Sequence, residues 1–434
     1  MTPSKRSAII EVDKRRVWHP YTPMRQYIDT TAPLVIERAR GSRLFDADGR
    51  SFLDGNSSWW TAALGHGHPR ILTALHRQSE QLCHTSLAGI THEHAALLAE
   101  ELVQVAPPGL ERVFYSDDGS TAVELAMKMA LQAHRLRGSS ERTRFVALDG
   151  AFHGETLGVT ALGGVEVFRR PFASVVLECF HVPIGIEGHR QAFHALEALL
   201  DREGSRIAAV VLEPLVQGAA GMKIYDGEYV QLVREATRRH GVLLVLDEVF
   251  TGYGRTGPMW ACQHVNVEPD ILCTAKGFTA GTLPMAATLA TNQIFETFLG
   301  DPSRAFYYGH TFCGHPLGAA VAREVLAIYR DEKILERASP KAARIAKAFS
   351  AMADLPGVAS TRSLGMVGAL DLDEQQGYLA DSGWRVYREA LQRGAYLRPL
   401  GNVVYVAPPL NIDDDDLDEL LQIVASSVAA AMGR

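Results

Sequence analysis

The feature that most constrains the fold of this chain is an alternation of short apolar, β-branched runs with helix-like stretches, between about residues 110 and 290. Such an alternation predicts parallel strands joined by crossover helices. The runs are apolar throughout, as expected of strands that are covered on both faces. We therefore predict an α/β fold with a doubly covered sheet. The predicted strands are Arg112–Tyr115, Arg144–Leu148, Ile207–Leu212, Val242–Leu246, Ile271–Cys273 and Met285–Ala290.

The last hundred residues have a different pattern, in which helices alternate with short strands. The helices are Lys341–Ala351, Trp384–Arg393 and a closing helix that opens with Asp413–Asp416, and the strands are Gly365–Leu372 and Val403–Val406. This pattern predicts an α+β subdomain. The first sixty residues are typical of an arm and a hairpin, which we expect to pack on that subdomain. The predicted parts are 1–60 (arm and part of the small domain), 61–325 (large domain) and 326–434 (small domain).

Charge and cysteine usage limit the partners of the chain. Its 434 residues include 43 Lys and Arg and 50 Asp and Glu, a net charge of −7, without a basic run that would favour nucleic acid or an anionic membrane surface. The five cysteines are scattered and form no C-x-x-C pair, so neither a disulfide framework nor a zinc ribbon is predicted. No stretch has the composition of a signal peptide or of a membrane-spanning helix. We expect a cytoplasmic protein with small-molecule partners.

The most informative stretch is Gly241–Gly257, where five apolar residues run directly into Asp247 and Glu248. In an open α/β sheet, ligands collect beyond the carboxyl ends of the strands. Asp247 is therefore predicted to face a cofactor. The alternative is a helix cap or a surface acid, which the residue alone does not exclude.

A second predicted strand ends at Thr274-Ala275-Lys276-Gly277. A lysine at a buried strand end between small residues is placed to lose its hydration, which lowers its pKa and makes it a nucleophile toward a carbonyl. The alternative is a solvated loop lysine. The pattern favours Lys276 as a catalytic residue only in combination with Asp247.

The third element is the segment Phe114–Thr121, which leads into a helix with an apolar face. The small Gly119-Ser120 pair leaves backbone N–H groups free to hold a phosphate, and Thr121 with Glu124 is predicted to form a capping box. Ordinary capping explains the turn equally well by itself. Together, a phosphate cradle, a lysine for an aldehyde and a carboxylate for a ring nitrogen predict pyridoxal 5'-phosphate as cofactor.

At this point the sequence resembles a known family. The run D-E-x-x-T-G-x-G-R-T-G from Asp247, the lysine 29 residues after that aspartate, and F-H-G-E-T at Phe152–Thr156 are similar to motifs of the class III aminotransferases of fold type I. The resemblance extends from about Trp18 to Pro409. It implies a large domain with a mainly parallel seven-stranded sheet, a smaller α+β domain, and a homodimer with its active sites at the interface.

Further stretches resemble the branch of this family that acts in biotin synthesis. They are Trp18–Thr22, Ser57–Trp60, Gly89–His92, Val216–Ala219 and Arg398–Asn402. The resemblance implies transfer of an amino group from S-adenosylmethionine to 8-amino-7-oxononanoate, giving 7,8-diaminononanoate. Two alternatives stay open: the same acceptor with lysine as donor, or a general ω-amino acid or diamine aminotransferase.

The resemblance also implies residue roles. Lys276 would bond covalently to the cofactor and Asp247 would bind its pyridine nitrogen. The remaining cofactor residues would be Gly119, Ser120 and Phe152, with His310 and Thr311 from the other subunit. The substrate residues would be Tyr21, Trp59, Phe152, Lys276, Gly309 and Arg398.

Several positions depart from the family pattern. Phe152 stands where a tyrosine is usual, Asp118 replaces a serine, and Gly309–Pro316 carries histidines where proline and asparagine are common. Phe152 can still stack on a pyridine ring, but it has no hydroxyl to offer a substrate. The identity of the amino donor is therefore less constrained than that of the acceptor.

Two other classes of protein are suggested by short motifs. Gly252–Gly257 spells G-x-G-x-x-G, but a dinucleotide site needs a strand directly before it and a helix directly after, whereas Asp247-Glu248 precede it and Pro258 follows. The pairs His66/His68 and His92/His94 lack the i, i+4 spacing of a helical zinc site. We expect turn and cap roles for these histidines, and no metal site.

Overall fold

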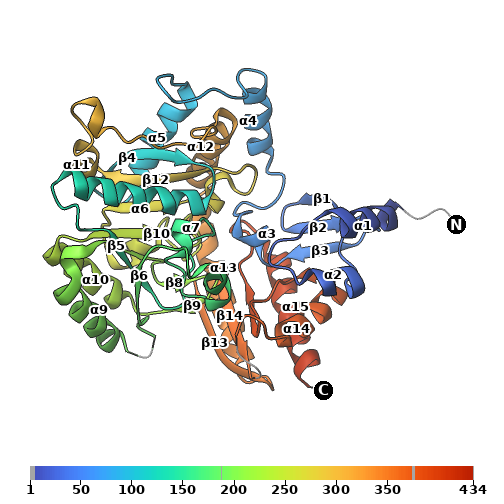
Figure 1. Ribbon diagram of the computed structural model, residues 1–434. Helices are drawn as coiled ribbons and strands as arrows, with labels where there is room; N and C mark the ends of the chain where they lie inside the picture. The colour runs from blue at the N-terminus through green and yellow to red at the C-terminus, as the bar shows by residue number, and fades with distance from the viewer. Residues whose placement is uncertain (1–4, 187, 374–376, 434) are drawn as a thin grey trace.

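The computed structural model describes residues 5–186, 188–373 and 377–433. A seven-stranded sheet forms the centre of the larger part of the molecule (Figure 1), and all but one of its strands run in the same direction. This confirms the predicted α/β fold with a mainly parallel sheet. In spatial order the strands are β4 (Leu110–Ser116), β12 (Ala286–Thr291), β11 (Ile271–Thr274), β10 (Leu243–Asp247), β7 (Ile207–Leu212), β5 (Arg144–Leu148) and β6 (Cys179–Val182).

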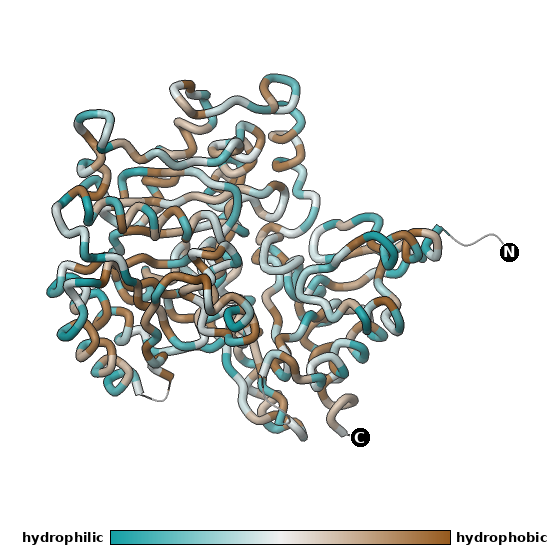
Figure 2. The backbone as a smooth tube through the Cα atoms, viewed as in Figure 1, coloured by the Kyte–Doolittle hydropathy of each residue, from teal (hydrophilic) through white to brown (hydrophobic). Residues whose placement is uncertain are grey.

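The central strands are apolar throughout because helices cover both faces of the sheet. Successive residues of a strand point to opposite faces, so Leu243 and Val245 pack with α6 (Gly119–Leu136), while Leu244 and Leu246 pack in a second cluster. That second cluster contains the apolar faces of α5 (Glu93–Val105), α9 (His189–Glu203), α10 (Gly227–His240) and α12 (Pro316–Asp331). In Figure 2 apolar segments follow the strands, and the outer loops are mostly hydrophilic.

Two strands differ from the prediction. β12 is antiparallel to both of its neighbours, β11 and β4, because the short connection after β11 contains only a 3₁₀ turn (Lys276–Thr279) and no crossover helix that could return the chain for a parallel strand. β6 was not predicted. It is a four-residue edge strand with a largely half-buried pattern, so it lacks an apolar run.

The ends of α10 illustrate how the sequence sets a helix. Asp226 accepts a hydrogen bond from the backbone N–H of Glu228 and caps the first turn. Gly241 ends the helix with φ +61°, a left-handed conformation that glycine adopts without the cost of a Cβ. β10 begins two residues later, so this cap directs the strand that carries Asp247.

The remaining residues form a second group of sheets and helices, in which the amino- and carboxyl-terminal segments lie together (Figure 1). β3 pairs in parallel with β15, Leu53 opposite Ala395, and Arg43 forms a 2.6 Å ion pair with Asp416. The amino-terminal hairpin therefore packs on carboxyl-terminal elements, as predicted. The three domain boundaries themselves stay a prediction.

The elements of this second group follow the predicted α+β pattern. One sheet consists of β1 (Ile36–Arg40), β2 (Arg43–Asp46), β3 (Ser51–Asp54) and β15 (Ala395–Tyr396), and another of β13 (Val358–Leu364), β14 (Val367–Leu372) and β16 (Val403–Val406). Their helices are α1 (Lys5–Arg16), α2 (Met24–Thr30), α13 (Ile334–Met352), α14 (Ser382–Gln392) and α15 (Asp414–Met432). Short elements elsewhere are α3 (Ser57–Trp60), α4 (Pro69–Ser79), α7 (Leu157–Thr160), α8 (Glu166–Arg169), β8 (Val216–Gln217), β9 (Lys223–Ile224) and α11 (Asn292–Glu296).

Among the helices of the described residues, none combines the length and the apolar composition that a bilayer span requires.

Candidate active site

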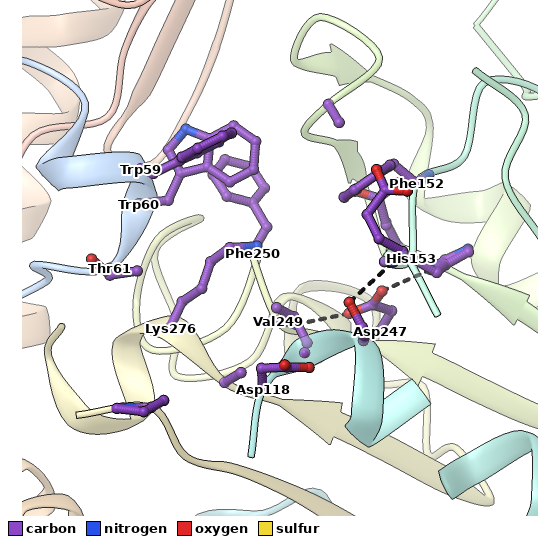
Figure 3. A pocket seen from close by; sticks show the side chains of 18 of the residues that line it. Trp59, Trp60, Thr61, Asp118, Phe152, His153, Asp247, Val249, Phe250 and Lys276 are labelled. Carbon is purple, nitrogen blue, oxygen red and sulfur yellow. Dashed lines mark hydrogen bonds and ion pairs between the residues drawn. The ribbon is translucent and has the colours of Figure 1, made fainter. Parts of the chain in front are cut away.

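A cavity of about 450 Å³ opens at the carboxyl ends of the parallel strands (Figure 3). Asp247 is the last residue of β10, Lys276 follows β11 by two residues, and Glu213 directly follows β7. The chain's topology thus brings distant segments to one point, as expected for this class of sheet. Of the predicted site residues, those that line the cavity are Tyr21, Trp59, Gly119, Ser120, Phe152, Asp247, Lys276 and Arg398.

Asp247 is a buried acid held by two donors. Its Oδ2 lies 2.7 Å from Nδ1 of His153, and its Oδ1 accepts a hydrogen bond of 3.0 Å from the backbone N–H of Val249. Burial lowers the pKa of His153, but the hydrogen bond and charge of Asp247 outweigh it, so the pKa of His153 is raised overall. Because Asp247 is only 4% exposed, the alternative of a surface acid is wrong. The carboxylate is fixed in place at the edge of the cavity.

Lys276 reaches into the cavity from the opposite side (Figure 3). Its Nζ lies 4.9 Å from the centroid of a Trp60 ring, a cation–π contact. Burial lowers the pKa of Lys276, and the charges of Asp247 and Glu213 oppose this only in part. Its backbone has φ +48°, a strained conformation for a residue with a Cβ, as is common at functional sites. Lys276 is thus a partly dehydrated amine, in contrast to a solvated loop lysine.

The turn before α6 forms a cradle of small residues. A Cβ on Gly119 would meet Cγ1 of Val249 at 2.7 Å, so no larger residue fits there without displacing its neighbour. The Oγ of Ser120 accepts the backbone N–H of Glu155 at 3.1 Å. The cradle lies at the positive end of an 18-residue helix, which favours an anion such as a phosphate.

The predicted Thr121–Glu124 capping box is wrong. The helix starts at Gly119, so Asp118 is the N-cap and forms the box with Thr121. Glu124 instead accepts hydrogen bonds from the hydroxyl of Thr156 and the backbone N–H of Val159, at 2.7 and 3.2 Å. Glu124 therefore connects the segment after β5 to α6. Asp118 caps the first turn of α6, a role that a serine at this position could also fill.

The tryptophan pair lies on a left-handed turn. All four residues of α3, Ser57 to Trp60, have positive φ angles between 45° and 72°. Each left-handed non-glycine residue costs roughly 1–2 kcal/mol. The turn is held by 2.7 Å hydrogen bonds from the Ser57 hydroxyl to the carbonyl of Ala407 and from the Ser58 hydroxyl to Asp54. This strained turn places both Trp59 and Trp60 on the cavity wall.

Arg398 is an unpaired cation on the same wall. Its guanidinium carbon lies 4.8 Å from the Trp59 ring centroid and 6.0 Å from that of Trp384. Its backbone N–H donates to Oδ1 of Asn56 at 2.6 Å, which fixes its position. In the described part of the chain, no carboxylate lies within ion-pair distance of this guanidinium. The arrangement leaves its paired donors free for an anionic ligand.

Sequence reasoning missed several cavity residues, of which Glu213 is the clearest. Its carboxylate accepts the backbone N–H groups of Phe152 and Gly218 at 3.2 and 2.9 Å. Burial raises the pKa of Glu213 to about 7, although the nearby His153 lowers it. Glu213 follows an apolar run just as Asp247 does, so the same signal could have found it. Other lining residues that were given no role include His153, Glu155, Phe168 and Tyr378.

Gly309, His310 and Thr311 do not line the cavity. Nδ1 of His310 lies 2.7 Å from Oδ2 of Asp117 in the same chain, and Nε2 lies 2.9 Å from the hydroxyl of Tyr308. Asp117 lies two residues before Gly119 of the cradle. The role of these three residues at a partner's site stays a prediction.

The two motifs that suggested other classes of protein have structural roles. The segment Gly252–Gly257 is a turn with no helix directly after it, and Arg255 within it donates to the carbonyl of Pro408 at 2.7 Å. His92 accepts the backbone N–H of Ala95 as the N-cap of α5. The contact of His92 agrees with the predicted cap role, whereas His66 contacts Oδ2 of Asp54 at 2.9 Å and His94 contacts Arg323 at 3.0 Å.

The cavity residues fit pyridoxal phosphate. The cradle at Gly119 and Ser120 has no room for a side chain at position 119 and suits a phosphate. Lys276 supplies a partly dehydrated amine for an aldehyde, and Asp247 supplies a fixed carboxylate for a protonated ring nitrogen. The ring of Phe152 lines the cavity near Asp247 (Figure 3) and offers a flat apolar face.

Comparison with known proteins gives the same picture. The family model described as Aminotransferase class-III matches residues 26–428. The adenosylmethionine-8-amino-7-oxononanoate aminotransferase of Geobacter sulfurreducens is 37% identical, with 97% of each chain covered. The crystal structure of the enzyme of that name from Methanocaldococcus jannaschii has a TM-score of 0.94 at 35% identity, covering 98% of this chain and 99% of that one. An omega transaminase of Pseudomonas jessenii, solved in complex with PMP, has a TM-score of 0.93 at 26% identity, with 98% of each chain covered.

The fold, the cavity and the family match agree over nearly the whole chain. Class III aminotransferases depend on pyridoxal phosphate, the cofactor that the cavity residues fit. This chain is a member of the class III aminotransferase family.

Proposed function

We propose that this protein transfers an amino group from S-adenosylmethionine to 8-amino-7-oxononanoate, giving 7,8-diaminononanoate in biotin synthesis. The observation that carries the proposal is the unpaired Arg398, which lies on an aromatic wall of the cavity that also holds Lys276. The acceptor has a carboxylate at the end of an apolar chain, far from its ketone, and this arrangement is complementary to it. The names of the curated relatives support the same reaction.

When bound, pyridoxal phosphate supplies an aldehyde that accepts the amino group and a ring that delocalises negative charge. Lys276 would bond to it covalently, and its free Nζ would move the proton at the reacting carbon. The Asp247 carboxylate would hold a proton at the ring nitrogen, with His153 keeping the carboxylate oriented. Gly119 and Ser120 would bind the phosphate.

The apolar walls would orient the acceptor and exclude water. Tyr21 and Trp59 pack edge to face, with ring centroids 5.3 Å apart, and Phe168 packs against Phe152 at 5.6 Å. Phe152 contributes no hydroxyl, so polar recognition of the substrate falls to other groups. Arg398 would bind the remote carboxylate, so that the ketone lies over Lys276.

We also propose a cytoplasmic homodimer, in which Gly309, His310 and Thr311 complete the partner's site. Two-fold pairing is the commonest assembly of soluble proteins. Sedimentation at assay concentration, with activity measured on the same samples, tests this. A fully active monomer would contradict it.

The donor is tested by single-turnover spectroscopy of the cofactor-loaded enzyme. S-adenosylmethionine is expected to convert the cofactor to its amine form, and 8-amino-7-oxononanoate is expected to reverse the change. Lysine is the control donor. Conversion by lysine alone would establish the alternative donor, and rapid conversion by many ω-amino acids without preference for the acceptor would favour a general aminotransferase, a class represented among the similar structures.

A further inference from the structure

Glu155 differs from the other carboxylates that line the cavity. Four other carboxylates line the cavity, and each of them contacts a histidine, a backbone N–H group or both. They are Asp117, Asp118, Glu213 and Asp247. The carboxylate of Glu155 accepts a single hydrogen bond within the described residues, 2.6 Å from the hydroxyl of Tyr21 to Oε1, and has no cation within ion-pair distance there. Its second oxygen is therefore available to a ligand.

Glu155 lies next to the phosphate cradle, at the cofactor end of the cavity. It is on the loop after β5 that carries Phe152, and its backbone N–H donates to Oγ of Ser120 in the phosphate cradle at 3.1 Å. Burial and the charge of Glu155 raise the pKa of Tyr21, so the Tyr21 hydroxyl remains a donor that holds this carboxylate. Glu155 is thus an exposed residue of the cavity lining, held by Tyr21 through its carboxylate and by Ser120 through its backbone.

The cavity also keeps Glu155 apart from Arg398. Contacts run from Glu155 to Tyr21, from the Tyr21 ring to the Trp59 ring at 5.3 Å, and from Trp59 to the Arg398 guanidinium at 4.8 Å. Two aromatic rings therefore separate an unpaired anion from an unpaired cation. A substrate that fits both has a cationic group near its reacting carbon and a carboxylate at its far end.

The acceptor of the proposed function, on which this inference rests, has that charge pattern, since 8-amino-7-oxononanoate carries its amine on the carbon next to the ketone. We propose that Glu155 is a specificity-determining residue that binds this amine in its cationic form, while Arg398 binds the carboxylate. Phe152 cannot accept a hydrogen bond from this amine, because it has no hydroxyl. Selection for an amino ketone over a plain ketone then depends on Glu155.

The test compares kcat/KM for 8-amino-7-oxononanoate and for 7-oxononanoate, which lacks the amine, in the cofactor-loaded enzyme with one donor. The variants are Glu155→Gln, which removes the charge, and Glu155→Asp, which keeps it on a shorter side chain. The matched control is Glu166→Gln at the start of α8, an exposed acid that does not line the cavity.

A charge-assisted hydrogen bond at a partly solvated site is expected to give the parent enzyme a preference of about tenfold for the amino ketone. Glu155→Gln should abolish this preference through KM, with little change in kcat. Glu155→Asp should keep part of it, and Glu166→Gln all of it.

An equal loss on both acceptors in Glu155→Gln would overturn the proposal, because it would mean that Glu155 only positions Tyr21. An unchanged preference in Glu155→Gln, or no preference in the parent enzyme, would also overturn it. If the parent enzyme aminates pyruvate but neither of the two long-chain keto acids, the proposed function itself fails.

Discussion

Replacement of Arg398 by alanine removes the only guanidinium that lines the described cavity. A hydrogen bond to a charged group contributes about 1.5–3 kcal/mol when it is well formed. Arg398 is partly exposed, so we take the lower end of this range, about 1.5 kcal/mol, which corresponds to about a tenfold loss in kcat/KM for the keto acid. The loss should fall mainly on KM, with a smaller effect on kcat because remote binding also orients the ketone.

The alanine variant also loses packing against Trp59 and Trp384, so loss of activity alone is ambiguous. The assay therefore compares the keto acid with its methyl ester in the parent enzyme, Arg398→Ala and Arg398→Lys. The parent should prefer the acid about tenfold, the lysine variant less because it lacks paired donors, and the alanine variant not at all. If the alanine variant keeps the preference for the acid, Arg398 does not bind the carboxylate and the reasoning is refuted.

Three further predictions concern the buried ionisable groups. Lys276→Ala should abolish turnover while the protein still binds pyridoxal phosphate non-covalently, measured as activity and as cofactor retained after gel filtration; retained transamination would contradict it. Asp247→Asn should lower the rate by several orders of magnitude with an unchanged circular dichroism spectrum, because an amide cannot keep the ring nitrogen protonated, and an unchanged rate would mean that Asp247 is only structural. The raised pKa of Glu213 means that the folded state holds its proton longer than the unfolded state, whose pKa is near 4.5, so this residue's contribution to the free energy of unfolding falls as pH rises from about 4.5 to 7. The total change is about 3 kcal/mol relative to Glu213→Gln. The free energy of unfolding is measured with urea at several pH values, and a difference between the two proteins that stays constant from about pH 4.5 to 7 would refute the prediction.

The sequence predicted the parts of the site that follow from local pattern. Asp247 and Lys276 come directly after apolar runs, and the carboxyl ends of such strands meet at one edge of a sheet. Glu213 carries the same signal after β7, yet a glutamate followed by proline in a single sequence looks like an ordinary strand end. The motif after β5 contained His153, but only the folded chain shows that its imidazole contacts Asp247, 94 residues away.

Other features could not be predicted, because they depend on long-range packing. The left-handed turn at Ser57–Trp60 contradicts the preference of each of its residues, and it persists because Ala407 and Asp54 hold it. The contact between Tyr21 and Glu155 joins residues 134 positions apart, and no periodicity encodes it. The direction of β12 depended on the absence of a crossover helix, which the apolar run itself does not reveal.

The central claim is that Lys276 carries pyridoxal phosphate in a site that Asp247 and the Gly119-Ser120 cradle complete. The most direct measurement is borohydride reduction of the cofactor-loaded protein, followed by proteolysis and mass spectrometry of the peptides. We predict a single phosphopyridoxyl adduct, located on Lys276, with loss of the adduct in Lys276→Ala. A principal adduct on any other lysine, or no adduct in a protein that aminates its acceptor, would contradict the claim.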